Sequence, residues 1–314
     1  MKKVFIDGSA GTTGLRIFDR LHGRTDIQLL TLPESERKLE SSRKRLLNEA
    51  DVVFLCLPDD AAREAASWVE NPDTVVLDTS TAHRTAPGWC YGFPELSPVQ
   101  EARLRQAKRI AVPGCHASGF IALVYPLISA GLLAPDVLLS CYSLTGYSGG
   151  GKKMIADYES PDRPAHSKLD APKSYGLSLA HKHLPEMKEI SGLAHTPMFV
   201  PVVCDYYCGM QVLVPLDLTV AGTTAEAVAA GLADYYKDAA TVKVHALNEP
   251  LPENGLYSNA MAGTDRMELY LTVNAAGDQM MLVSLFDNLG KGSSGAAVQC
   301  MNLMLGLPET QGLE

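Results

Sequence analysis

The chain turns from a strand pattern to a helix pattern at Val112-Pro113-Gly114-Cys115-His116-Ala117-Ser118-Gly119. The apolar run 110–112 predicts a strand, the Pro-Gly pair predicts a turn, and the apolar run 120–125 predicts a helix. We therefore expect Cys115 at or near a helix N-terminus, where backbone N–H groups and the helix dipole favour an anion. Such a setting lowers the pKa of a thiol and makes it a nucleophile, whereas a buried structural cysteine is the alternative.

Composition and charge narrow the classes of protein to which the chain can belong. Its 314 residues are 46% hydrophobic, enough for a large core that we expect to be divided between two domains. The net charge of −9 argues against nucleic-acid binding, and no apolar run approaches the length of a membrane span. The N-terminal run Val4-Phe5-Ile6 is cut short by Asp7, so we expect no signal peptide. The seven cysteines are scattered, which is typical of a cytoplasmic protein. The one close pair, Cys204 and Cys208, lies in an apolar stretch, so we predict no metal site.

A glycine motif follows the first predicted strand, residues 2–6, and precedes a predicted helix that begins near Leu15. In a strand–turn–helix context, glycines let the backbone approach a pyrophosphate, whose charge the helix N-terminus receives. The spacing G-x-x-G-x-x-G differs from the usual G-x-G-x-x-G, and a plain structural turn is the alternative. The predicted cofactor contacts are Gly8, Ser9, Gly11, Thr12, Thr13 and Gly14.

The residues after the second predicted strand, 27–32, decide between NAD and NADP. An acidic residue there binds the ribose 2′-hydroxyl of NAD, whereas basic residues hold the 2′-phosphate of NADP. Glu34 would favour NAD, but Ser35, Arg37 and Lys38 together can hold a phosphate, so we predict NADP(H).

The rest of the first domain alternates strands and helices. Runs 51–57 and 74–77 predict parallel strands buried on both faces, and 61–69 and 98–107 predict helices. Ser80 follows a strand end, where doubly wound sheets bind ligands, and we predict that it contacts the cofactor. The fold class is therefore α/β, with a Rossmann-type dinucleotide-binding domain over 1–113 that the C-terminal helix 289–314 completes.

Residues 114–288 predict an α/β substrate and oligomerisation domain with a mixed sheet. Longer strands are expected at 137–144 and 211–220, the second broken by Pro215, and 265–274 pairs with 279–286 as a hairpin. An open mixed sheet favours a homodimer or homotetramer.

Three further stretches of this second half can carry chemistry. Tyr147-Ser148-Gly149-Gly150-Gly151-Lys152-Lys153 predicts a flexible loop that holds an anionic substrate, with a solvated hinge as the alternative. His181 and His183 are two apart, so in an extended segment both face one side, and one can act as general base. Residues 287–295 open the last helix, 296–305, with an amide and glycines that suit cofactor binding.

These motifs, namely the first glycine motif, YGFPEL (91–96), PGC (113–115), SGGGK (148–152), HKHLPE (181–186) and NLGKGSSGAAVQ (288–299), together resemble a known family. The chain is similar to the N-acetyl-γ-glutamyl-phosphate reductases of arginine biosynthesis, in their short form, with aspartate-semialdehyde dehydrogenases as wider relatives. Two positions differ from the pattern of many members. His116-Ala117-Ser118 stands where Tyr-Pro-Thr is common, and Lys182 stands where Arg is frequent.

The resemblance implies a mechanism and roles for particular residues. Cys115 would attack an acyl phosphate, release phosphate and form a thioester that NADPH reduces, with His181 as the base. His183, Tyr175, Ser148 and Lys152 would bind substrate, and Asn288 and Lys291 would contact the cofactor. Which of His181 and His183 is the base stays open.

Three other functions are alternatives. The chain can be a dehydrogenase for another acyl phosphate such as aspartyl phosphate, a non-catalytic NADP-binding regulatory protein, or a cysteine hydrolase. A regulatory protein needs no reactive Cys115, and a hydrolase makes no use of the first glycine motif.

Overall fold

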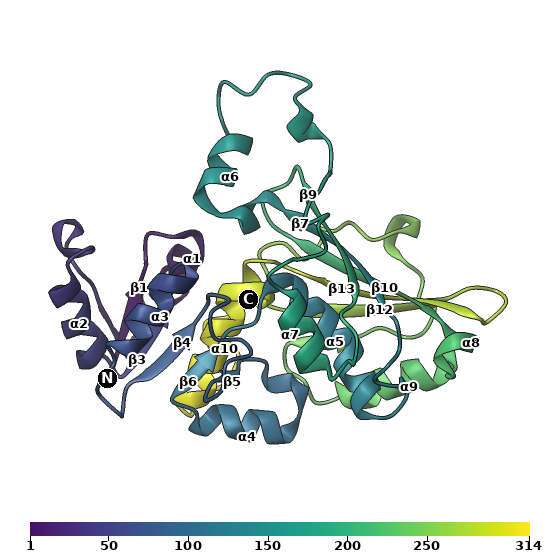
Figure 1. The fold of residues 1–314 in the computed structure, drawn as a ribbon, viewed down its shortest axis with the longest axis horizontal. Coiled ribbons are helices and arrows are strands. Elements are labelled where there is room, and N and C mark those ends of the chain that lie inside the picture. Colours follow the sequence, from purple (N-terminus) through teal and green to yellow (C-terminus); the bar gives the residue numbers. More distant parts are fainter. The chain divides into compact units, whose positions relative to one another are not determined.

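A computed structural model describes residues 1–314, which form two compact units. Unit 1 consists of residues 1–114 and 293–313, and unit 2 of residues 115–292 with Glu314. Each unit has its own sheet (Figure 1).

Unit 1 contains a six-stranded sheet in the order β2-β1-β3-β4-β6-β5, in which all strands are parallel. Its strands are β1 Lys2–Asp7, β2 Ile27–Leu30, β3 Val52–Leu55, β4 Val75–Asp78, β5 Cys90–Tyr91 and β6 Arg109–Ala111. The chain reverses its direction of travel across the sheet between β1 and β3. Doubly wound sheets bind their ligands at the carboxyl ends of the strands on either side of such a reversal.

Helices cover both faces of this sheet, because its strands bury side chains on both sides. The helices are α1 Thr12–Leu21, α2 Glu40–Glu49, α3 Asp59–Ser67, α4 Pro98–Gln106 and α10 Gly295–Met304, with short η1 Glu34–Glu36 and η2 Pro94–Leu96. Val52 and Phe54 of β3 pack in one core with α1 and α10, whereas Val53 and Leu55 pack in a second core with α2 and α3. In Figure 1, α10 (yellow) lies beside the sheet of unit 1, so both ends of the chain build this unit.

Unit 2 contains a seven-stranded mixed sheet in the order β11-β12-β13-β10-β7-β9-β8. Its strands are β7 Ser140–Gly146, β8 Lys173–Ser174, β9 Met198–Cys204, β10 Met210–Asp217, β11 Val242–Val244, β12 Met267–Val273 and β13 Gln279–Phe286. The predicted hairpin is present, since β12 and β13 pair antiparallel from Met267 opposite Phe286 to Val273 opposite Met280.

One helix organises the core of unit 2. Its helices are α5 Cys115–Ser129, α6 Gly151–Tyr158, α7 Leu184–Ser191, α8 Leu218–Ala221 and α9 Ala225–Tyr235, with η3 Tyr147–Gly150, η4 Lys168–Asp170 and η5 Pro252–Asn254. The short η6 Gly290–Ser294 begins in unit 2, and its last two residues belong to unit 1. The almost wholly apolar α5 packs on β10 and β13 and also contacts α7 and α9. None of the helices in the protein combines the length and the apolar character that a membrane span requires.

The predicted α/β class with a Rossmann-type sheet and a mixed sheet is confirmed, but two local predictions are wrong. Pro215 does not break its strand, because β7 runs beside β10 only as far as Leu213, and Pro215 lies where β10 has one neighbour. The strand ends at Asp217, whose side chain accepts the N–H of Val220 at 2.9 Å and caps α8. Residues 147–153 form η3 and the start of α6 instead of a flexible loop.

Candidate active site

Cys115 is the first residue of α5, as the sequence predicted. The strand β6 ends at Ala111, and the Pro113-Gly114 turn brings the chain to the start of the helix. Because 11 of the 15 residues of α5 are buried, the core holds this helix firmly and fixes where its N-terminus points. None of the seven cysteines is in a disulfide, so Cys115 carries a thiol.

A glycine turn lies against Cys115. A Cβ built on Gly292 would lie 3.0 Å from Cys115 Cβ and 3.1 Å from the carbonyl oxygen of Asp287, so a side chain there would crowd the cysteine. The buried Asp287 holds the turn, since its carboxylate accepts the N–H of Leu289 at 2.7 Å and of Gly263 at 2.6 Å. Sequence reasoning singled out this glycine stretch but missed Asp287.

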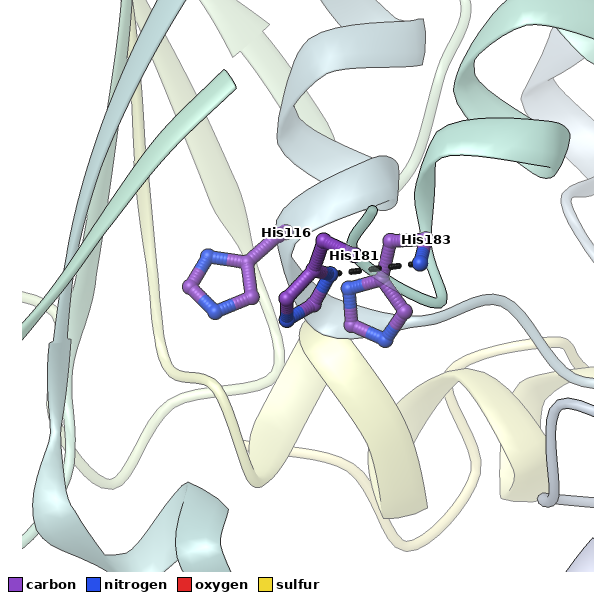
Figure 2. A group of neighbouring side chains, drawn as sticks. All are labelled: His116, His181 and His183. Carbon is purple, nitrogen blue, oxygen red and sulfur yellow. Dashed lines mark hydrogen bonds between the residues drawn. The ribbon is translucent and has the colours of Figure 1, made fainter. Parts of the chain in front are cut away.

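Three imidazole rings gather beside the start of α5 (Figure 2). The ring centroids of His181 and His183 are 4.8 Å apart, and that of His116 lies 5.7 Å from His181 and 5.4 Å from His183. One ring nitrogen of each residue lies within 4.8 Å of those of the other two, a spacing at which three histidines can also ligate a metal ion. The sequence predicted the pair but not His116, although it directly follows the cysteine.

The pair comes together through a turn and not through an extended segment. His183 has helical dihedral angles and is the N-cap residue of α7, and its backbone N–H donates to His181 Nδ1 at 3.2 Å. Because Nδ1 accepts this hydrogen bond, a neutral His181 carries its proton on Nε2.

The electrostatics of the cluster keep the rings of His116 and His181 neutral at physiological pH. Burial, together with the nearby charges of His181 and Lys182, lowers the pKa of His116 to about 3. Burial and the charge of Lys182 lower the pKa of His181 to about 4. His183 Nε2 lies 4.0 Å from the carboxylate of Glu186, and both of these side chains are buried.

Two polar side chains hold the His116 ring. Its Nδ1 lies 2.7 Å from Ser143 Oγ on β7, and its Nε2 lies 2.8 Å from the hydroxyl of Tyr175, which follows β8. Burial and the negative charge of the Cys115 thiolate raise the pKa of Tyr175 well above its ordinary value. Cys115, Tyr175, His181 and His183, which we predicted separately, are therefore gathered in one part of unit 2.

The other predicted site residues of unit 2 differ in burial: Ser148, Asn288 and Lys291 are buried, whereas Lys152 is exposed. Ser148 is buried and accepts a hydrogen bond from Asn288 Nδ2 at 3.0 Å, while Asn288 Oδ1 accepts the N–H of Gly209 at 2.9 Å. Lys152 is exposed on α6, whereas Lys291 is buried in the glycine turn. Both ends of the Asn288 side-chain amide are thus hydrogen-bonded, one to Ser148 and the other to the backbone of Gly209.

The predicted cofactor turn of unit 1 has the geometry of an anion site. Gly8 has φ +88°, and a Cβ there would lie 2.3 Å from Cys56 O, while a Cβ on Gly14 would lie 2.4 Å from Gly8 O. No side chain caps α1 and no acidic residue occupies its first turn, so its N-terminal N–H groups suit a phosphate. The Oγ1 of Thr12 is buried without a hydrogen-bond partner. Thr13 lies 3.4 Å from the hydroxyl of Ser293, and Ser9 is half-buried in the same turn.

The residues that we predicted to read the 2′-phosphate lie on or just after η1. Ser35, Arg37 and Lys38 are all exposed there. Sequence reasoning missed a neighbouring arginine, Arg43, which forms an ion pair with the buried Asp7 at 2.8 Å and lies 4.8 Å over the Trp68 ring.

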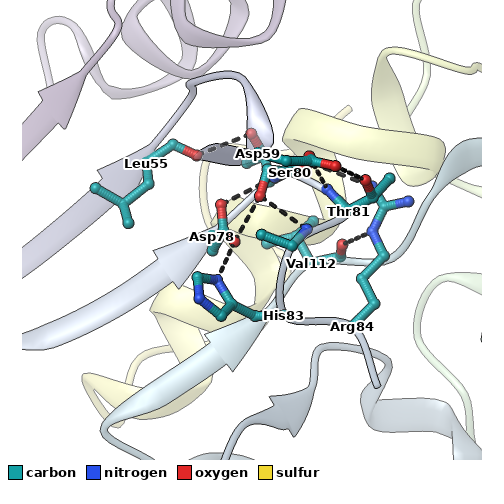
Figure 3. A network of polar contacts seen from close by, with 10 residues as sticks. Leu55, Asp59, Asp78, Ser80, Thr81, His83, Arg84 and Val112 are labelled. Carbon is teal, nitrogen blue, oxygen red and sulfur yellow. Dashed lines mark hydrogen bonds and ion pairs between the residues drawn. The ribbon is translucent and has the colours of Figure 1, made fainter. Parts of the chain in front are cut away.

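A polar network holds the loop that follows β4 (Figure 3). Asp78 is fully buried and accepts from Ser80 Oγ at 2.7 Å and from His83 Nδ1 at 2.6 Å. Arg84 Nε donates to the carbonyl of Val112 at 3.0 Å. Ser80 is therefore fixed near a strand end, as a ligand site in this fold requires.

Comparison with known proteins identifies relatives of both units. The semialdehyde dehydrogenase NAD-binding domain matches residues 3–104, and the semialdehyde dehydrogenase dimerisation domain matches residues 115–288. The chain is 48% identical over 305 residues to an N-acetyl-gamma-glutamyl-phosphate reductase of Burkholderia cenocepacia, covering 96% of this chain and 97% of that protein. It is 46% identical to N-acetyl-gamma-glutamyl-phosphate reductase 2 of Pseudomonas putida, with 98% of each covered.

Solved structures share the fold at low identity. Aspartate semialdehyde dehydrogenase II from Vibrio cholerae superposes with a TM-score of 0.72 at 16% identity, covering 98% of both chains. A probable aspartate-semialdehyde dehydrogenase from Pseudomonas aeruginosa gives 0.74 at 14% identity, covering 97% of this chain and 98% of that one.

Proposed function

Because this chain belongs to the semialdehyde dehydrogenase family, among the N-acetyl-γ-glutamyl-phosphate reductases, we propose that it reduces N-acetyl-γ-glutamyl phosphate with NADPH. The products are N-acetylglutamate 5-semialdehyde and phosphate, in arginine biosynthesis. One observation carries the proposal: Cys115 begins a buried helix beside three clustered histidines, of which His116 and His181 are neutral at physiological pH.

The first step uses the thiolate of Cys115 as nucleophile. Its sulfur attacks the acyl carbon, the C–O bond to phosphate breaks, and phosphate leaves with the electron pair, which gives a thioester on Cys115. Backbone N–H groups at the start of α5 are placed to stabilise the oxyanion of the tetrahedral intermediate. Bound NADPH supplies the hydride that reduces this thioester, and the C–S bond then breaks to release the aldehyde and the thiolate.

The histidines provide proton transfer at neutral pH. With a pKa near 4, the His181 ring is neutral at physiological pH, and it can take the thiol proton only on Nδ1, which must then release the His183 N–H. With Nδ1 bound to the His183 N–H, the Nε2–H of His181 is a donor for an oxygen that gains charge. We propose His181 as the acid–base residue and His183 as a substrate contact, and variants of each residue separate the two roles.

We propose that unit 1 binds NADP(H) through its first glycine motif. Its pyrophosphate would be held at the N-terminus of α1, where Gly8 and Gly14 leave the space that a Cβ would fill. Ser35, Arg37 and Lys38 would hold the 2′-phosphate, and Ser80, Asn288 and Lys291 would be further cofactor contacts. In unit 2, Tyr175, Ser148 and Lys152 bind the substrate.

The match to a dimerisation domain indicates that the protein oligomerises, and we propose a cytoplasmic homodimer or homotetramer. Ser143 of β7 points toward α5, so the preceding residue, Tyr142, points to the opposite face of the sheet, where it is 50% exposed. Met198 of the neighbouring β9 is 67% exposed. A Tyr142→Lys variant should shift the protein toward the monomer in light scattering after gel filtration, and unchanged mass would exclude this face.

The reverse reaction tests the function. N-acetylglutamate 5-semialdehyde, phosphate and NADP are mixed with the protein, and NADPH formation is followed by absorbance, with Cys115→Ser in parallel. We expect phosphate-dependent turnover by the wild type and none by the variant. Turnover with aspartate semialdehyde alone would instead assign an aspartyl phosphate substrate, and turnover by Cys115→Ser would remove Cys115 as the nucleophile.

A further inference from the structure

We propose that His116 is a positioning residue in a directed hydrogen-bond chain. Ser143 donates to His116 Nδ1, His116 Nε2–H donates to the Tyr175 oxygen, and Tyr175 is left to donate its own proton to the oxyanion that forms on Cys115. The inference rests on the proposed function and assigns a role to a residue at which this chain departs from the Tyr that the family commonly has.

Geometry ties His116 to both partners. The ring is buried at the second residue of α5, with Ser143 Oγ at 2.7 Å on one side and the Tyr175 hydroxyl at 2.8 Å on the other. Phe199 lies edge-on at a centroid distance of 5.2 Å and limits rotation of the ring. Both ring nitrogens are therefore engaged.

The direction of the chain follows from Ser143. Its hydroxyl is fully buried, and its one hydrogen-bond partner is His116 Nδ1. A buried hydroxyl proton without an acceptor costs more free energy than an acceptor oxygen with an unused lone pair. The Ser143 hydroxyl therefore donates its proton to His116 Nδ1. Since burial keeps the His116 pKa near 3, the ring is neutral and its single proton lies on Nε2.

This tautomer decides what Tyr175 can do. A phenol oxygen that accepts from Nε2–H still has its own proton to donate. Tyr175 lies close enough to Cys115 for the thiolate charge to raise the pKa of Tyr175, so the reacting centre is within its electrostatic reach. A hydroxyl directed in advance toward the oxygen that gains charge stabilises the transition state more than the bound substrate.

Metal binding is the competing explanation for the three rings. To ligate a metal, His116 would have to break its hydrogen bond to Ser143 or to Tyr175. His181 would have to ligate through Nε2, because its Nδ1 accepts the His183 N–H. The hydrogen bonds therefore favour a proton-ordering role for His116.

The kinetic test combines Ser143→Ala, Tyr175→Phe and the double variant. We expect Tyr175→Phe to lower kcat by about 10²-fold with KM nearly unchanged, as for loss of one oxyanion donor. Ser143→Ala should lower kcat about tenfold, because the His116 proton can then move to Nδ1 and Tyr175 turns toward Nε2. The double variant should be no slower than Tyr175→Phe. Multiplicative losses, or a change in KM alone, would overturn the proposal.

The matched controls are Ser140→Ala, three residues before Ser143 on the same strand, and Tyr257→Phe, an exposed tyrosine of unit 2. Both should leave kcat unchanged. A loss of kcat in Ser140→Ala equal to that in Ser143→Ala would show a general effect of the strand and overturn the proposal.

A spectroscopic test is independent of turnover. In ¹⁵N-histidine-labelled protein, with His116 assigned from the spectrum of His116→Gln, we expect an unprotonated Nδ1 and a protonated Nε2 at pH 7. Protonation at Nδ1 would overturn the proposal even if the enzyme is active. If the wild type does not reduce the acyl phosphate, the proposed function fails, while the ring tautomer still decides the hydrogen-bond chain.

Discussion

Acidification should destabilise this protein through His116, and the effect has a predictable size. The residue is 3% exposed, and its pKa of about 3 lies below the ordinary value of 6.5. Below pH 6.5 the unfolded chain binds a proton at this position and the folded chain does not, so stability falls as the pH falls toward 3. At about 1.4 kcal/mol per pH unit, going from pH 6.5 to pH 4.5 costs about 2.7 kcal/mol through this one group.

The test compares urea unfolding of the wild type and His116→Gln at pH 7.5 and pH 4.5. Both tryptophans, Trp68 and Trp89, lie in unit 1, whereas all of the 12 tyrosines except Tyr91 lie in unit 2. Near-ultraviolet absorbance of tyrosine therefore reports on the unit that contains the cluster.

The substitution itself will change stability at both pH values, so the measured quantity is the change in unfolding free energy between them. We expect the wild type to lose about 2 to 3 kcal/mol more than His116→Gln does. The exposed His195 of the same unit provides the control, since His195→Gln should keep the wild-type loss. Equal losses in wild type and His116→Gln would refute the reasoning, because His116 would then carry no shifted pKa.

Three further substitutions test the site. His181→Ala should lower kcat by about 10²- to 10⁴-fold in the reverse reaction followed by NADPH absorbance. A change in KM alone would make His183 the better candidate for the base. Arg37→Ala, at an exposed position, should weaken NADPH more than NADH in fluorescence titration, and equal weakening would remove Arg37 as the 2′-phosphate contact. Gly8→Ala should lose NADPH binding in the same titration, because the new Cβ would lie 2.3 Å from Cys56 O and displace the turn. Retained binding would place the pyrophosphate elsewhere.

The first unit was the more predictable because its signals are local in sequence. Each buried parallel strand is a short apolar run, and a run such as 52–55 stays apolar since helices cover both faces. The first glycine motif and the helix that follows it are adjacent in the chain, so their geometry can be inferred without long-range contacts. The polar network around Asp78 is different, because it involves loop residues whose partners only the fold selects.

For the catalytic region of the second unit, the sequence identified most of the residues but not the contacts between them. Cys115 and His181 were identified from their local motifs. His116 was treated as a departure from a family pattern, because nothing in the sequence shows that Ser143 of β7 and Tyr175, which follows β8, meet its ring. Pro215 was misjudged for the same reason, since whether a proline breaks a strand depends on which neighbours the strand has.

The low pKa values of His116 and His181 affect both the proposed catalysis and the stability of the protein in acid. Three rings whose centroids lie within 5.7 Å of one another cannot all be charged, because like charges at that distance repel and burial removes the water that would screen them. At neutral pH His116 and His181 are therefore uncharged, and a proton on one of these rings disfavours a proton on the other. The same low pKa values mean that an unfolded chain gains protons that the folded site refuses, so the cluster favours catalysis at neutral pH and weakens the fold in acid.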